Sequence, residues 1–215
     1  MKLTWDATGK HYYENGVDHG VLYPQKADGT YDDGVAWDGL TGVTESPDGA
    51  EPNDLYADNI KYATLRSAET FGGTIEAYQY PKEFAACDGS VNLVDGVYIG
   101  QQPRVPFGFC YRTNIGSDTM ASGTQYKLHI VYNATVTPSE RNYETVNDSP
   151  DAITMSWDFD TVPVNVTDQK PTSTIVIDSR EANATKLAAL EDMLYGTANT
   201  DPTLPSPDEI VALFQ

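Results

Sequence analysis

Asp158 and Asp160 form the residue pair in this sequence whose spacing most resembles a catalytic arrangement. Residues i and i+2 of a β-strand point to the same face, and glycoside hydrolases place two carboxylates around the bond that they cleave. However, segment 153–160 alternates large apolar residues with small or acidic ones. Any strand with one solvated face shows this pattern, so the pair favours a solvated strand face over a catalytic site.

Other residue types that carry chemistry are sparse and scattered. His11, His19 and His129 are the only histidines, and the sequence contains no HExxH, GxSxG or Walker A motif. His129 falls on the polar side of an alternating segment, which favours a solvated or interface histidine over a metal ligand. We therefore expect no enzymatic activity and no catalytic, cofactor-binding or metal-binding residues.

Asp-Gly pairs leave calcium binding open as an alternative. An EF-hand loop needs acids at its first, third and twelfth positions and a glycine at its sixth. With Gly34 as the sixth residue, Gly29 comes first and Leu40 twelfth, so that spacing fails. Tight turns explain the Asp-Gly pairs more simply. These pairs begin at Asp28, Asp33, Asp38 and Asp48.

The charge of the chain restricts its partners. The 215 residues include 32 acidic and 13 basic side chains, a net charge of −19. Nucleic-acid binding needs a basic surface that neutralises phosphates, and anionic membranes also attract basic proteins, so neither partner is expected. The N-terminal residues lack the apolar core of a secretion signal. Cys87 and Cys110 are expected to be reduced and partly buried.

The hydrophobic pattern predicts a mainly antiparallel β protein with a short flanking helix. The expected strands span 74–80, 107–113, 126–136, 153–160 and 172–177, with weaker candidates at 16–23 and 92–99. Helices are expected at 81–87, 181–195 and 208–214. We therefore divide the chain into a β domain, 1–180, with a long acidic loop at 27–60, and a C-terminal helical extension, 181–215.

An ordered set of short motifs identifies a resemblance. The motifs are GVAWDGLTGVTESPDGAEPNDLYADNIKY (34–62), ETFGGTIEAY (69–78), PKEFAACDG (81–89), GFCYRTNIG (108–116), YKLHIVYNA (126–134), PSER (138–141), NDSPDAITMSW (147–157) and KPTSTIVIDS (170–179). Each is weak alone, but together and in this order they resemble the major tail protein of long, non-contractile-tailed phages of Gram-positive bacteria. The resemblance covers residues 16–191.

This resemblance implies a β-sandwich or partly closed barrel that assembles into hexameric rings, and the rings stack into a tail tube. Such a tube conducts DNA into the host at ejection and has no enzymatic activity or cofactor. The implied partners are other copies of the chain and the tape-measure, tail-terminator and distal tail proteins. The implied location is the virion, after assembly in the host cytoplasm.

The acidic loop has a place in this hypothesis. Residues 27–59 contain nine acids and no Lys or Arg. In tube proteins of this kind a long excursion before a strand reaches the neighbouring ring, and a mobile surface loop is the alternative. The expected apolar anchors of the loop are Trp37, Leu40, Val43, Leu55 and Tyr56. Acids on the polar faces of strands would line the lumen and repel DNA, and the candidates are Glu76, Asp158 and Asp160.

Two other functions remain open from the sequence. Trp5, Trp37 and the abundant tyrosines are also compatible with a carbohydrate-binding β-sandwich. A tail terminator, or the tube protein of a contractile injection system, would share the same architecture.

Overall fold

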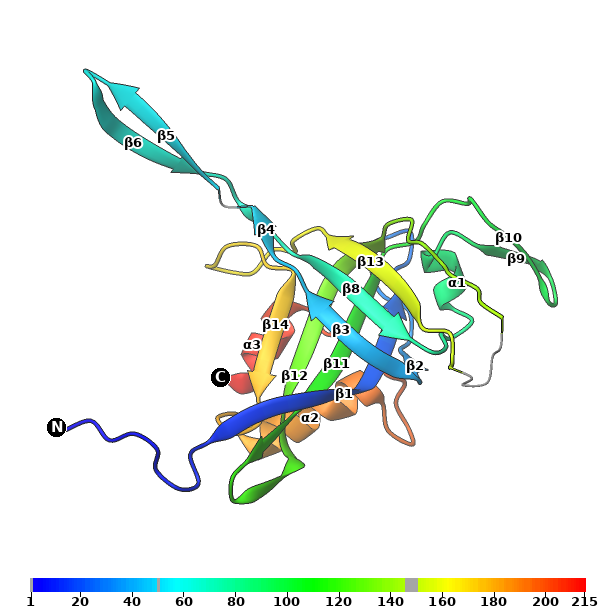
Figure 1. The fold of residues 1–215 in the computed structure, drawn as a ribbon. Helices are drawn as coiled ribbons and strands as arrows, with labels where there is room; N and C mark the ends of the chain where they lie inside the picture. Colours follow the sequence, from blue (N-terminus) through cyan, green and yellow to red (C-terminus); the bar gives the residue numbers. More distant parts are fainter. Residues whose placement is uncertain (1, 50, 146–150) are drawn as a thin grey trace.

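A single curved, antiparallel sheet organises the computed structural model, which describes residues 2–49, 51–145 and 151–215. Residue 50 of the acidic loop and residues 147–150 of the seventh motif lie outside that range. The eight-stranded sheet has the order β2-β1-β11-β12-β13-β8-β3, and β14 pairs with β12 beside β13. Its two edges are not hydrogen-bonded to each other, so the sheet curls without closing (Figure 1). The strands are β1 (Tyr12–Pro24), β2 (Val35–Trp37), β3 (Leu40–Glu45), β8 (Gly72–Ala77), β11 (Phe107–Ser117), β12 (Met120–Val136), β13 (Met155–Thr161) and β14 (Thr174–Asp178).

The concave side of the sheet encloses an aromatic core. Trp157, Trp37 and Phe84 pack edge-on or tilted, with ring centroids 4.5 to 5.7 Å apart. Such tilted and edge-to-face contacts are favourable arrangements for aromatic rings. Phe84 comes from the short helix α1 (Phe84–Cys87), which fills the space at one end of the curled sheet.

The convex side of β1, β11 and β12 is also apolar, and two C-terminal helices cover it. Leu187, Leu190 and Leu194 of α2 (Ala184–Tyr195) and Ile210 of α3 (Pro207–Phe214) pack on this face. A buried hydrogen bond also holds α2 on the sheet: the Tyr23 hydroxyl donates to the Leu194 carbonyl over 2.6 Å. The central strands are therefore buried on both faces.

Local sequence sets the limits of both helices. The Asn183 side chain accepts hydrogen bonds from the backbone of Thr185 and Lys186, which caps α2. Ser206 and Glu209 form a reciprocal capping box at α3. These helices confirm the expected ones at 181–195 and 208–214. In the described part of the chain, no helix is long and apolar enough to cross a lipid bilayer.

A bulge in β12 reverses the faces to which its later side chains point. The sequence predicts one alternating face over 126–136, but Asn133 has a φ of 47°, and the pairing with β11 slips by one residue there. A one-residue bulge moves the following side chains to the other face. Leu128 and Ile130 consequently face the helices, whereas Ala134 and Val136 face the aromatic core.

Two hairpins leave the sheet (Figure 1). The first spans 46–71 and is named the arm here: β4 (Asp48–Gly49) pairs with β7 (Glu69–Thr70) at its base, and β5 (Pro52–Ala57) pairs with β6 (Ile60–Arg66) beyond it. The second, named the ribbon, joins β9 (Val91–Val94) to β10 (Val97–Ile99) through the Asp95-Gly96 turn.

These hairpins correct two expectations. Segment 27–60 is not one long loop, because β2 and β3 belong to the main sheet and β5 lies in the arm. Segment 92–99 is two strands rather than one, because Gly96 with a φ of 82° reverses the chain. The mainly β, antiparallel fold with a short flanking helix and C-terminal helices is confirmed. Cys87 and Cys110 are buried free thiols, as expected.

Candidate functional site

The arm is an amphipathic two-stranded sheet that stands clear of the rest of the chain (Figure 1). Its pairing register, Leu55 with Ala63 and Ala57 with Ile60, places these apolar residues on one face together with Leu65. The opposite face carries an ion pair and a hydrogen bond beside the ring of Tyr56: Lys61 Nζ lies 2.7 Å from Asp54 Oδ1, and Thr64 donates to the same carboxylate oxygen. Leu55 is 40% exposed and Ile60 is 65% exposed. An isolated two-stranded hairpin is marginally stable in water, so this apolar face suits a contact with another molecule.

Only two of the five expected loop anchors lie on the arm. Leu55 and Tyr56 are in β5, and Tyr56 is 71% exposed. Trp37, Leu40 and Val43 are instead part of the fold, which corrects the expectation. Trp37 is 3% exposed in the aromatic core, and Leu40 and Val43 pack against that core.

The physical reason is the Asp38-Gly39 turn, one of the Asp-Gly pairs that the sequence analysis interpreted as tight turns. The turn directs β2 and β3 along the two sides of the sheet opening. Leu40 then lies over Gly20 of β1, where a Cβ atom would come within 2.3 Å of Leu40 Cδ1. This close contact of the Leu40 side chain with Gly20 packs β3 against β1 across the opening.

The three candidate lumen acids share one uncovered face. Ser156 pairs with Glu76, and Asp158 pairs with Thr74, so Glu76, Asp158 and Asp160 all point away from the core of β8 and β13. All three are exposed. Thr74 donates to Asp158 across the strand pair over 2.6 Å. The face is therefore negatively charged, as a DNA-repelling lumen wall would need to be. A lumen itself would exist only in an assembly of several copies.

A buried polar group at the sheet opening was missed by the sequence analysis. His129 is 9% exposed, which corrects the expectation of a solvated or interface histidine. Its ring stacks on Tyr111 at 4.7 Å between centroids, and its Nδ1 lies 3.3 Å from Glu45 Oε1. Tyr111 also donates to Glu45 over 2.6 Å. Glu45 ends β3 and directly precedes the arm, so this group ties the arm's root to β11 and β12.

The electrostatics of this group follow from its contacts. The His129 contact lowers the pKa of Glu45, burial opposes it, and the Tyr111 hydrogen bond adds to the lowering. Burial, followed by the Glu45 carboxylate, raises the pKa of Tyr111. The group therefore holds Glu45 as a carboxylate. A period-two pattern gives no signal for it, because its members are far apart in the sequence.

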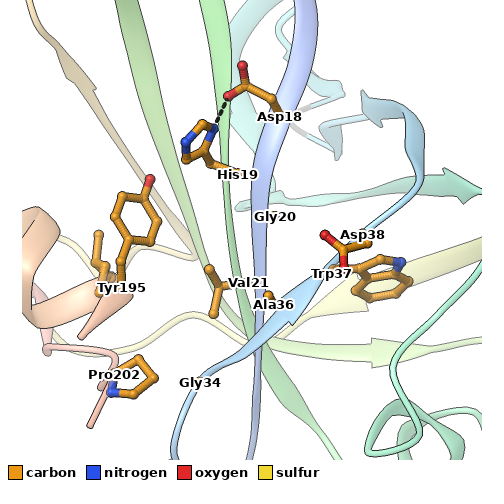
Figure 2. A pocket seen from close by; sticks show the side chains of 11 residues that line it. Asp18, His19, Gly20, Val21, Gly34, Ala36, Trp37, Asp38, Tyr195 and Pro202 are labelled. Carbon is orange, nitrogen blue, oxygen red and sulfur yellow. Dashed lines mark hydrogen bonds and ion pairs between the residues drawn. The ribbon is translucent and has the colours of Figure 1, made fainter. Parts of the chain in front are cut away.

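A recess lies between β1, β2 and the end of α2, with a volume of about 630 Å³ (Figure 2). Asp18 and His19 line one side, joined by a 2.7 Å hydrogen bond, and Tyr195 and Pro202 line the other. Burial raises the pKa of Asp18, but hydrogen bonds from Arg112, Asn114 and His19 outweigh it and hold the pKa below its usual value. Asp18 is therefore already engaged in the fold, although the recess has the size of a small-ligand site.

Compared with known proteins, the chain matches no protein-family model and no curated protein sequence.

Proposed function

We propose that this protein is a structural subunit that assembles into hexameric rings, which stack into the tail tube of a long, non-contractile-tailed phage. The tube would be a component of the virion and would conduct DNA at ejection. Its other partners would be the tape-measure, tail-terminator and distal tail proteins. Catalysis has no part in this proposal.

The observation that carries the proposal is the amphipathic arm. It extends away from the sheet, and its apolar face has no cover within the described chain. A monomer that kept this face in water would carry an aggregation-prone hairpin. Burial of the face between subunits removes that cost, so the arm is best explained as an assembly element.

The acidic face of β8 and β13 supports the same function. DNA binds proteins through basic side chains that displace its counterions. A wall that presents Glu76, Asp158 and Asp160 repels phosphate instead, so DNA would slide past it without adhering.

Negative-stain electron microscopy of the purified protein tests the proposal. Stacked rings are expected from the wild type. A variant in which residues 51–67 are replaced by a short Gly-Ser turn should fold normally and remain monomeric, because no residue of this segment belongs to either core cluster. Tubes from this variant would contradict the role of the arm, and a wild type that never forms rings would contradict the function.

The recess favours a second candidate, a carbohydrate-binding module, because Tyr195 and Asp18 combine an aromatic ring with a polar group. Against it, Trp37 is a core residue and cannot present its ring to a sugar. A glycan array decides between them: specific binding that Tyr195→Ala abolishes would support the module.

A further inference from the structure

Besides the arm, the ribbon is an apolar feature that has no cover within the described residues. Six of its side chains are both apolar and exposed, namely Val91, Leu93, Val94, Val97, Tyr98 and Ile99. Only Asp95, in the turn, is charged. Exposed apolar groups that gather on one hairpin in this way mark interaction sites more often than scattered ones do.

Arm and ribbon lie at opposite ends of the molecule (Figure 1). A contact between unlike surfaces on opposite ends is head-to-tail, and it repeats from copy to copy until it closes into a ring or continues as a helix. A contact of either hairpin with its own kind would instead stop at a dimer.

Charge favours a contact between an arm and a ribbon over a contact between two arms. The tip of the arm carries Asp58 beside Asn59, in a turn where both residues have positive φ. At the root of the ribbon, Lys82 stands on the rim of a recess of about 370 Å³ between α1 and β9. The Lys82 side chain is 83% exposed, and Glu83 lies 3.8 Å from its Nζ. An arm docked along the ribbon can place its acidic tip near this lysine, whereas two arms would bring like charges together.

We infer that the arm of one copy docks on the ribbon of the next. The apolar arm face, with Leu55, Ile60 and Leu65, packs against the apolar ribbon residues, and Asp58 lies near Lys82. The inference rests on the proposed self-assembly and deepens it, because it names the acceptor surface.

A mixing experiment tests the pairing. One variant, Leu55→Ser with Ile60→Ser, loses the arm face, and another, Leu93→Ser with Val97→Ser, loses the ribbon. All four residues are exposed, so both variants should keep the wild-type melting temperature. The matched control is Val162→Ser with Val211→Ser, which changes two exposed apolar residues elsewhere and should assemble like the wild type.

Sedimentation velocity gives the readout. Each variant alone should associate about 100-fold more weakly than the wild type, as expected when two apolar anchors are lost. An equimolar mixture should form 1:1 heterodimers that do not grow, because one intact arm still meets one intact ribbon. Charge reversal with Lys82→Glu should weaken association, and Asp58→Lys in the same chain should restore part of it.

Other outcomes overturn the inference. If the ribbon variant assembles like the wild type, the arm docks elsewhere, although the tube function survives. Dimers of the arm variant alone would mean that ribbons pair with ribbons. A wild type that stays monomeric at its highest soluble concentration contradicts both proposals, whereas heterodimers in the mixture without wild-type tubes would contradict only the tube.

Discussion

The convex face of the sheet differs between its two halves. On β1, β11 and β12, helices cover a cluster of outward apolar residues, among them Val21, Cys110 and Leu128. On β8 and β13, the outward residues are Glu76, Asp158 and Asp160, and they stay exposed. The same backbone arrangement thus serves as a core layer in one half and as a charged surface in the other.

The difference teaches how to interpret strand sequences in this fold. β11 begins with Phe107-Gly-Phe-Cys-Tyr111, which is buried at every position, and a continuous run of this kind requires cover on both faces. β13 alternates strictly between buried and exposed residues from Trp157 to Asp160. Continuous runs therefore indicate helix cover, and strict alternation indicates an open face.

The largest expected effect comes from placing a charge on the covered half. Leu128 is fully buried beneath the helices. Leu128→Asp should lower the free energy of unfolding by more than about 4 kcal/mol, because it buries an unpaired carboxylate. Urea denaturation measures this loss. The reciprocal change on the open half, Asp158→Leu, should cost less than about 1 kcal/mol, and equal losses would refute the comparison.

Truncation in the shared aromatic core should have the next largest effect. Trp157 points inward from the same strand as Asp158 and contacts Trp37 and Phe84. Trp157→Ala should lower the free energy of unfolding by about 3–5 kcal/mol through lost contacts and a cavity. A loss below about 1 kcal/mol in the same denaturation assay would show that the face is assigned incorrectly.

Acid should loosen the sheet opening at Glu45. The Glu45 pKa in the folded protein lies below the ordinary value of 4.5. Its contribution to stability is therefore complete at pH above the unfolded pKa and is lost as pH falls through the folded pKa. Glu45→Gln should lose less stability than the wild type on acidification. The residual loss arises from the other carboxyl groups whose pKa values are lowered, including Asp18 and Asp178. Urea denaturation at a series of pH values measures these losses. Equal losses of unfolding free energy in the two proteins as pH falls would contradict this role.

The smallest change in stability is expected on the acidic face. Asp158→Lys with Asp160→Lys should alter the free energy of unfolding by less than about 1 kcal/mol, because both residues are exposed. If the face lines a lumen, the variant should assemble and yet slow or block DNA ejection, since the added cations bind phosphate. Ejection kinetics of reconstituted virions measure this, and wild-type rates with lysines that demonstrably line the bore would refute the electrostatic account.

Local patterns predict much of this fold, and contacts between distant residues account for the rest. The capping residues Asn183 and Ser206 and the alternation around Trp157 are legible in the sequence because each depends on near neighbours. The burial of Trp37 depends on Phe84 and Trp157, which lie far away in the chain. No pattern in the sequence signals the His129–Glu45 contact.

At the candidate assembly surface, only two of the five anchors expected from the sequence lie on the arm. Leu55 lies on the apolar face of the arm, whereas Tyr56, the next residue of β5, pairs with Lys61 on the opposite face. Ile60 and Leu65 were not named, because segment 60–66 was not recognised as the returning strand of a hairpin. The Asp58-Asn59 turn is the signal that could have revealed it. The ribbon could likewise have been recognised from its Asp95-Gly96 turn.

The helical cover also sets an order of events during synthesis. Tyr23 donates its buried hydrogen bond to Leu194, 171 residues later in the chain. Ribosomes add about 5–20 residues per second, so roughly 10–30 s separate the two residues at translation. During that interval the convex face of β1, and later of β11 and β12, has no cover, and nascent chains must be kept apart or bound by chaperones until α2 emerges.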